Sequence, residues 1–330
     1  MTQRRALVTG ASGQTGSYMV DLLLEKGYTV FAGTRRTSTS NTERLAHCLS
    51  RITLLPMDLT DSSSLEHALY EAMPHEVYNF AAQSFVAESF ATPLATSDVT
   101  GLGALRLFEA VRNVCPTARV YQASSSEMFG NSRAPQSETT PFAPVSPYAA
   151  AKTFAHYCAQ VYRRAYRMYI ACGICFNHES ERRGEEFVTR KISKAVAAIK
   201  TGQQPRLVLG NLAAMRDWCH AEDVVRGAWA MLQEEEAADY VLASGKTHSV
   251  QEFVARAFDT VGLTWGDYVD IDPQFYRPAE VNVLCGDATK ARSLLNWRPR
   301  VSFEELVARM VGHDLAVADA DLSRARGARG

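Results

Sequence analysis

The sequence lacks features that define several whole classes of protein. Its 330 residues carry a formal net charge of −1, so it has no basic excess of the kind that general nucleic-acid binding requires. No apolar run approaches the ~20 residues of a membrane span, and the first residues have no signal-peptide pattern. We therefore expect a cytoplasmic protein with no nucleic-acid or membrane partner. An anionic small molecule would need only a local basic pocket.

Cysteine is also scarce. The seven cysteines are an odd number spread along the chain, which is typical of reduced thiols in the cytoplasm. Cys172 and Cys175 have the spacing of a redox pair. Such a pair usually opens a helix, where the dipole lowers a thiol pKa. Residues 168–176 instead have the pattern of a buried strand, so two ordinary core cysteines are the favoured interpretation.

Short apolar runs alternate with helical patterns along much of the chain, which is typical of βαβ units and a parallel sheet. Strands are predicted at residues 6–9, 29–33, 52–57, 76–81, 119–123, 168–176 and 239–243. Helices are predicted at residues 17–26, 63–72, 100–114, 147–166 and 249–261. The sequence thus predicts an α/β fold, a doubly wound parallel Rossmann sheet with a smaller α/β substrate-binding lobe.

Composition suggests how the chain is divided. Residues 1–177, with parts of 215–248, are predicted to form the Rossmann domain that binds the cofactor. Residues 178–214, which are rich in charge and glycine, and residues 249–315 are predicted to form the substrate lobe. The tail 316–330 is small, polar and charged, so disorder is predicted there.

A glycine-rich segment follows the first predicted strand. Residues 10–16 read GASGQTG, and glycines at this place allow a tight turn and close approach of the backbone to a pyrophosphate. The helix that follows would offer unpaired N–H groups to the phosphates. The end of the second strand carries Arg35 and Arg36 and no acid for the ribose hydroxyls of NAD. Because guanidinium binds a phosphate bidentately, NADP is the predicted cofactor.

Two residues suited to proton transfer begin a predicted helix after a serine cap. Tyr148 and Lys152 are four residues apart and share one helix face. Lowering a tyrosine pKa from ~10 to about 7 requires ~4 kcal/mol, which an ammonium ~4 Å away supplies at an effective dielectric of 20. Residues 121–127, YQASSSE, end a strand and add Ser125 and Glu127. Simple alcohol oxidation needs no carboxylate there, whereas a second proton transfer does.

Together these motifs resemble the extended short-chain dehydrogenase/reductase family, and within it the GDP-mannose 4,6-dehydratases, over about residues 5–315. The segments that make the resemblance specific are residues 77–84, 121–127, 176–180, 187–192, 210–212, 216–218 and 276–281. The resemblance implies an NADP-dependent lyase (hydro-lyase) that needs no metal and no outside redox partner. It also implies a homodimer or homotetramer in which the loop after Arg36 reaches a neighbour.

The implied reaction assigns a role to each chemical residue. Tyr148, aided by Ser125 and Lys152, would deprotonate the C4 hydroxyl of GDP-mannose while hydride passes to NADP. Glu127 would then remove the C5 proton as water leaves C6, and hydride would return to C6 to give GDP-4-keto-6-deoxy-mannose.

The predicted binding residues come from the motifs and the resemblance together. Those expected to contact the cofactor are Gly10, Gly13, Gln14, Thr15, Gly16, Arg35, Arg36, Asp58, Leu59, Ala81, Ala82, Gln83, Ser84, Tyr148, Lys152, His178 and Arg183. Those expected to hold the nucleotide sugar are Ser84, Ser126, Asn177, Val188, Lys191, Arg216, Arg277 and Glu280.

Three alternatives stay open. A GDP-4-keto-6-deoxy-mannose reductase shares the fold and can keep Ser125 and Glu127. A dehydratase of another GDP-hexose is possible because Glu181 and Cys219 depart from the usual pattern near the expected sugar pocket. An NADP-sensing binding module with a dead active site is disfavoured by the intact set of chemical residues.

Overall fold

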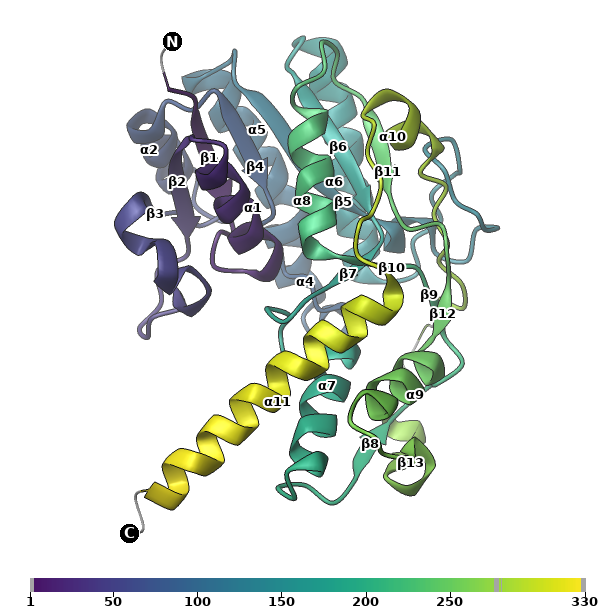
Figure 1. Cartoon of the computed structure of the whole chain (residues 1–330). Coiled ribbons are helices and arrows are strands. Elements are labelled where there is room, and N and C mark those ends of the chain that lie inside the picture. The colour runs from purple at the N-terminus through teal and green to yellow at the C-terminus, as the bar shows by residue number, and fades with distance from the viewer. Residues whose placement is uncertain (1–2, 276–278, 280, 328–330) are drawn as a thin grey trace.

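The centre of the molecule is a seven-stranded sheet (Figure 1). The computed structural model describes residues 3–275, 279 and 281–327. The strand order is β11-β6-β5-β4-β1-β2-β3, and every neighbouring pair is parallel. These strands are β1 (Arg5–Thr9), β2 (Thr29–Thr34), β3 (Ile52–Pro56), β4 (Glu76–Asn79), β5 (Arg119–Ser125), β6 (Ile170–Cys175) and β11 (Asp239–Leu242). All seven were predicted, and the parallel Rossmann fold is confirmed.

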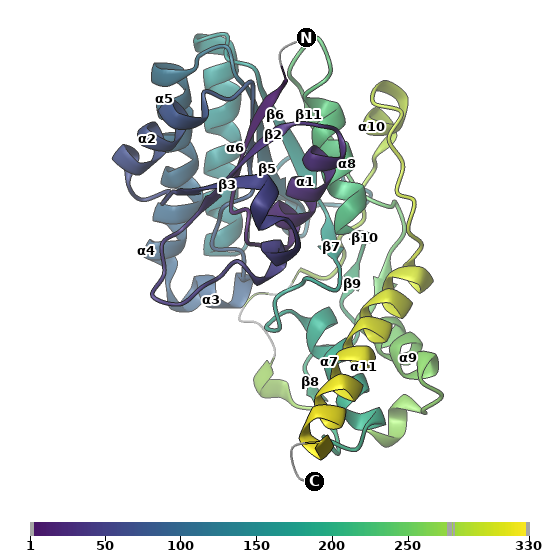
Figure 2. The same cartoon turned by 60° about the vertical axis from the view of Figure 1, so that its left-hand side comes forward.

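Helices cover both faces of this sheet (Figure 2). One face carries α1 (Gln14–Glu25) and α8 (Ala221–Met231), and the other carries α2 (Ser62–Ala72), α5 (Gly103–Val114) and α6 (Pro147–Ala165). The buried side chains separate into two clusters accordingly, one with Met19 and Val224 and one with Leu65 and Leu107. A parallel sheet is stable only when both faces are covered in this way.

Shorter helical segments complete this part of the chain. They are η1 (Glu43–Arg51), α3 (Val86–Ala91), α4 (Pro93–Thr96), the π-helical η2 (Ser97–Leu102), η3 (Ser126–Phe129) and α10 (Thr289–Leu294). Helix α1 begins at Gln14, three residues before its predicted start. Its N-cap is Gly13, which has no capping side chain, so the sequence carries no ordinary start signal there.

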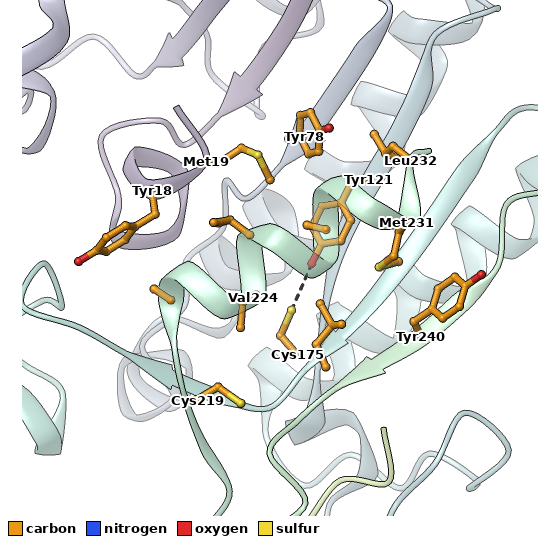
Figure 3. Packing of buried hydrophobic residues seen from close by; sticks show 14 of the residues in the cluster. Tyr18, Met19, Tyr78, Tyr121, Cys175, Cys219, Val224, Met231, Leu232 and Tyr240 are labelled. Atoms are coloured by element: carbon orange, nitrogen blue, oxygen red, sulfur yellow. Dashed lines mark hydrogen bonds between the residues drawn. The ribbon is translucent and has the colours of Figure 1, made fainter. Parts of the chain in front are cut away.

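The cluster beneath α1 and α8 reaches the carboxyl end of the sheet (Figure 3). The hydroxyl of Tyr121 on β5 lies 3.2 Å from the Sγ of Cys175 on β6. A Cβ at Gly173 would lie 2.4 Å from that hydroxyl, so the large ring requires glycine beside it. Cys172 belongs to the opposite cluster. The two cysteines of the CGIC motif therefore lie on opposite faces of one strand and do not form a redox pair.

A third hydrophobic cluster lies beyond the carboxyl edge of the sheet (Figure 1). It joins α7 (Val188–Lys200), α9 (Val250–Thr260) and α11 (Phe303–Gly327) through residues such as Ile192 and Phe253. Short strands accompany these helices: β8 (Leu207–Leu209) with β13 (Val269–Ile271), β7 (Asn177–Glu179) with β10 (Trp218–His220), and β9 (Met215–Arg216) with β12 (His248–Ser249). Two further 3₁₀ turns are η4 (Trp265–Asp267) and η5 (Pro273–Phe275).

The predicted disorder of the tail 316–330 differs from the structure, in which α11 continues to Gly327. The earlier turns of α11 pack on α7, where buried Asp314 pairs with Arg190 at 2.8 Å and accepts a 2.6 Å hydrogen bond from Ser193. The residues that follow are rich in alanine and arginine, which have high helix propensity, so the anchored helix extends. Among the described helices, none combines the length and the apolar character needed to cross a membrane.

Asp217 links three separate segments behind the third cluster. Its side chain is fully buried between β9 and β10. It accepts hydrogen bonds from Ser244 N at 2.8 Å, Ser244 Oγ at 2.6 Å, Gly245 N at 2.8 Å and Gly286 N at 3.1 Å. Buried donors left without an acceptor are costly, so this carboxylate should contribute strongly to stability.

We expect Asp217→Asn to lower the free energy of unfolding by about 3 kcal/mol. The asparagine NH₂ group would face N–H and O–H donors that a carboxylate oxygen of Asp217 now accepts from. Denaturant unfolding of the cofactor-free protein measures this. Ser244→Ala is the matched control and should lose about 1 kcal/mol. It removes one of the four donors to Asp217, together with a contact to the exposed Lys246 backbone. An Asp217→Asn midpoint equal to that of the original protein would contradict this role.

Candidate functional site

A cavity of about 270 Å³ opens at the carboxyl ends of the strands, where the strand order reverses. Strand β2 lies on one side of β1 and β4 on the other, so the connections after β1 and β4 diverge. In parallel α/β sheets such a switch point is the usual place for a ligand. The walls come from the β1–α1 turn, the ends of β4, β5 and β6, the start of α6 and the segment 177–187.

The structure brings most of the predicted site residues together around this one cavity. The predicted residues that line it are Gly10, Gly13, Gln14, Thr15, Gly16, Ala81, Ala82, Ser84, Ser125, Ser126, Glu127, Tyr148, Lys152, Asn177, His178 and Arg183. These positions come from separate stretches of sequence, and only the fold makes them neighbours. Their individual roles stay predictions.

Other lining residues were not among the predicted site residues. They are Phe80, Val86, Ala123, Ser124, Cys175, Phe176 and Phe187. Phe80, Ser124 and Phe176 are each next to a predicted site residue at a strand end, and this adjacency is the signal that would have included them. Phe187 differs because it reaches the cavity through the turn before α7, next to the Arg183 guanidinium, whose Cζ lies 3.4 Å from the centre of its ring.

Several predicted residues lie elsewhere. Arg35 and Arg36 line a second hollow at the end of β2 together with residues 37–42 and 54–56. Leu59 is buried in the cluster beneath α2 and α5. Gln83 donates to Phe85 O at 3.0 Å and so shapes the turn after β4.

The predicted substrate residues and the two departures from the family pattern lie mostly away from the cavity. Among the described residues lining the cavity, Asp58, Val188, Lys191 and Arg216 do not appear. Arg277 and Glu280 lie outside the described residues. Glu181 accepts a 2.8 Å hydrogen bond from Tyr18, and Cys219 is buried in the core, so neither of these departures lines the described walls of the cavity.

The β1–α1 turn depends on close backbone contacts. Gly10 has φ +62°, and a Cβ there would lie 2.9 Å from Ala81 Cα on the neighbouring strand end. A Cβ at Gly16 would lie 2.2 Å from Gly10 O. Gly13 begins α1 without a side-chain cap, and the first turn carries no acid. The helix therefore presents its N–H groups and positive dipole end to the cavity, as a phosphate site requires.

The segment after β6 is tied to the start of α1. His178 Nε2 lies 2.9 Å from Thr15 Oγ1, and the Gln14 amide donates to His178 O at 3.0 Å. Burial and the nearby Arg183 charge lower the His178 pKa to about 4, so its ring is neutral at physiological pH. The Oδ1 of Asn177 is buried without a hydrogen-bond partner among the described residues. It is an acceptor that a ligand donor would satisfy.

The residues predicted to transfer protons lie at the start of α6 and the end of β5. Ser146 caps α6 by accepting from Ala149 N at 3.1 Å, with a proline in the first turn as predicted. Ser125 accepts from Glu127 N at 3.2 Å and thereby caps the short turn that carries the carboxylate. Both Tyr148 and Glu127 are more than nine-tenths buried.

The ionisation of Tyr148 differs from the sequence expectation. Burial raises the Tyr148 pKa to about 12, a hydrogen bond with Ser125 lowers it, and the Glu127 charge raises it. The Lys152 ammonium lies 5.9 Å from the centre of the Tyr148 ring and donates to Ala123 O at 2.8 Å. In the ligand-free site the ammonium is thus held by a carbonyl of β5, and its close contact with the phenol oxygen stays a prediction. Burial lowers the Lys152 pKa to about 8.

This set of donors fits a dinucleotide. The capless helix end and the small residues around it suit a pyrophosphate, while Tyr148, Lys152 and Ser125 surround the place where a nicotinamide and an alcohol would meet. Fold and site together define a Rossmann-type oxidoreductase chemistry with an added carboxylate, the class of extended short-chain dehydrogenase/reductases.

The chain belongs to the GDP-mannose 4,6 dehydratase family, whose profile matches residues 7–310. It is 51% identical over 325 residues to GDP-mannose 4,6 dehydratase 2 of Arabidopsis thaliana, covering 95% of this chain and 87% of that protein. The GDP-mannose 4,6 dehydratase of Homo sapiens is 46% identical over 338 residues, with 94% and 91% covered. This membership confirms the predicted hydro-lyase with a nicotinamide cofactor, which in this family is NADP.

Solved structures agree with the fold. The UDP-glucose 4-epimerase of Thermus thermophilus, in complex with NAD, has a TM-score of 0.83 at 25% identity, covering 94% of this chain and 98% of that one. The dTDP-glucose 4,6-dehydratase of Streptomyces venezuelae, with NAD bound, has a TM-score of 0.82 at 26% identity, with 94% and 96% covered.

We expect Lys152→Met to stabilise the cofactor-free protein at neutral pH by up to about 3 kcal/mol. The Lys152 pKa is about 8 when folded against an ordinary 10.5, so the unfolded chain binds more protons between these values. The destabilising contribution of Lys152 therefore shrinks as the pH rises across this window, and the advantage of the variant over the original protein disappears by its upper end.

Urea unfolding at pH values below, within and above the window measures this difference. Lys200→Met is the control, because Lys200 is exposed at the end of α7. A Lys152→Met variant that is less stable than the original protein at neutral pH, or a difference that does not change with pH, would contradict the expectation.

Proposed function

We propose that the chain converts GDP-mannose to GDP-4-keto-6-deoxy-mannose, with Tyr148, Ser125, Lys152 and Glu127 as the chemical residues. The observation that carries this proposal is the position of Glu127. A carboxylate on the cavity wall beside Tyr148, close enough for its charge to raise the Tyr148 pKa, supplies a second base that a plain alcohol dehydrogenase does not need.

The proposed steps balance without an outside oxidant. Tyr148, in hydrogen-bond contact with Ser125, accepts the proton of the C4 hydroxyl as the C4–H bond breaks. NADP, held at the β1–α1 turn and beside Tyr148 and Lys152, would supply the hydride acceptor for C4 and the hydride donor for C6, and its positive ring would favour the Tyr148 phenolate. Glu127 removes the C5 proton, which the new C4 ketone has made acidic, and the C6–O bond breaks. The two protons removed end on the departing water and on C5.

The cofactor contacts are proposed at the β1–α1 turn, the end of β4, and residues 177–183. Gly10, Gly13 and Gly16 would admit the pyrophosphate, as their tight backbone contacts and the uncapped helix suggest. Arg35 and Arg36 follow β2 at the same edge of the sheet, and we assign them to the 2′-phosphate of NADP.

We also propose that the chain divides into the predicted Rossmann domain and substrate lobe. The separate third cluster around α7, α9 and α11 supports this division. The sugar and its nucleotide would lie between the two parts. The proposed substrate contacts remain Ser84, Ser126, Asn177, Val188, Lys191, Arg216, Arg277 and Glu280.

We expect the purified protein to form the 4-keto product from GDP-mannose with only a catalytic amount of NADP. Glu127→Gln should lower turnover by about 10²–10⁴-fold, while NADP still binds, because the C5 base is lost and the cofactor contacts remain. With stoichiometric NADP this variant should accumulate the near-ultraviolet absorbance of reduced nicotinamide. Mass spectrometry of the product provides the second readout.

Glu88→Gln, an exposed acid on α3, is the control and should keep full activity. Full turnover by Glu127→Gln would overturn its assignment as the C5 base. Consumption of NADPH by a 4-keto substrate, without any product from GDP-mannose, would favour the alternative reductase. Product from a different GDP-hexose only would change the sugar and leave the reaction type intact.

We further propose a cytoplasmic homo-oligomer, built through α6 and its neighbours. Phe154, Tyr157 and Val161 form an exposed stripe on α6, each 42–52% exposed. Leu94 on α4 is 85% exposed and Leu102 on η2 is 43% exposed, and both elements pack against α6. An apolar surface of this extent, presented by helices, is typical of a twofold subunit contact. The seven free cysteines suit a reducing compartment.

We expect the double variant Tyr157→Arg, Val161→Arg to have a smaller solution mass than the original protein, because it places four like charges across a twofold contact. Light scattering after size-exclusion chromatography measures this. Tyr70→Arg on α2, where Tyr70 is 64% exposed, is the control. A monomeric original protein, or an oligomer unaffected by the two arginines, would rule this interface out.

A further inference from the structure

Helix α6 holds the end of β5 at two successive residues. Tyr148, Lys152 and His156 are spaced four apart and share one face of α6. Lys152 Nζ donates to Ala123 O at 2.8 Å, and His156 Nδ1 lies 2.9 Å from Ser124 Oγ. The two side chains thus act one helical turn apart on neighbouring residues of one strand.

The ring of His156 is fixed on all sides. It is 1% exposed and packs edge-on against Phe142, with ring centres 5.0 Å apart. Its Nε2 lies 3.2 Å from the Gln160 amide nitrogen and 3.5 Å from Asp239 Oδ2. Asp239 is held in turn by Arg163 at 2.6 Å. A chain of polar contacts therefore runs from Ser124 at the cavity to the edge strand β11.

The Lys152 contact lies at the cavity, whereas the His156 side chain lies behind the cavity wall. Lys152 lines the cavity and belongs to the proposed cofactor site, so a bound cofactor competes with Ala123 O for its ammonium. His156 is absent from the described walls of the cavity and has no access to a ligand there. Because His156 does not line the cavity, its contact with Ser124 does not face that competition.

We infer that His156 is a positioning residue. It holds Ser124, and with it Ser125 and Glu127, at a fixed position relative to Tyr148 while Lys152 contacts the cofactor. Ser125 follows Ser124 directly and caps the turn that carries Glu127, so a shift of the strand end displaces both groups. Displacements of ~1 Å can cost about 10²-fold in rate. The inference rests on the proposed function.

The test compares His156→Leu, Ser124→Ala and the double variant with the original protein. We expect each single variant to lower kcat by about tenfold or more, while KM for GDP-mannose and the Kd of NADPH, measured by fluorescence, change less than about twofold. The double variant should lose no more than either single variant. His156→Asn, whose amide reaches toward Ser124 from a position near that of Nδ1, should recover most of the lost kcat.

Thr153→Val is the matched control. Thr153 lies between Lys152 and His156, and its hydroxyl donates to Ala149 O within the helix. Its kcat should match that of the original protein. A His156→Leu kcat within twofold of the original, additive losses in the double variant, or a His156→Asn variant as slow as His156→Leu would each overturn the inference.

Unfolding of the cofactor-free variants gives a readout that does not need turnover. The coupling between His156→Leu and Ser124→Ala should change the unfolding equilibrium constant by about threefold or more relative to additivity. If the original protein forms no product from GDP-mannose, the proposed function fails, and this coupling by itself decides whether His156 holds Ser124. An additive result would then overturn the inference.

Discussion

The close approach of the β1–α1 turn to the end of β4 is the contact on which the site depends. Gly10 has a positive φ, and a Cβ there would lie less than 3 Å from the Ala81 backbone. Gly16 packs still more tightly on Gly10 O. Only glycines let β1 turn into α1 this close to the neighbouring strand. The same turn directs the uncapped end of α1 at the switch point of the sheet, so the proposed phosphate site and the strand packing come from one piece of backbone.

Helix α6 provides the second constraint, because one of its faces packs along β5. Its four-residue spacing places Tyr148 at the cavity, Lys152 beside Ala123 O and His156 beside Ser124. The strand ends in the serine that hydrogen-bonds Tyr148 and in the turn that carries Glu127. The geometry of the proposed acid–base residues is therefore set by the register between one helix and one strand.

The ligand-free site lowers the stability of the folded protein. Burial raises the Tyr148 pKa to about 12 and lowers the Lys152 pKa to about 8, so both charged forms are disfavoured before a ligand enters. Binding of a nicotinamide cation beside the phenol and a ribose beside the ammonium would lower both of these free-energy costs. This is the usual relation between a strained functional site and the scaffold that supports it.

Much of this protein follows from sequence alone. The seven strands follow from apolar periodicity, the glycine turn from backbone freedom, and the Tyr148–Lys152 pair from helical spacing. Each is a local pattern that consecutive residues predict. Helices α7, α8 and α11 were not predicted. Their stability comes from packing on other helices, α8 on α1, and α7 and α11 on each other through groups such as Asp314 and Ser193. The position of Lys152 on Ala123 O, the separation of Cys172 from Cys175, and the contact of His156 with Ser124 were decided by tertiary structure, because each depends on which distant segment the sheet places opposite that side chain.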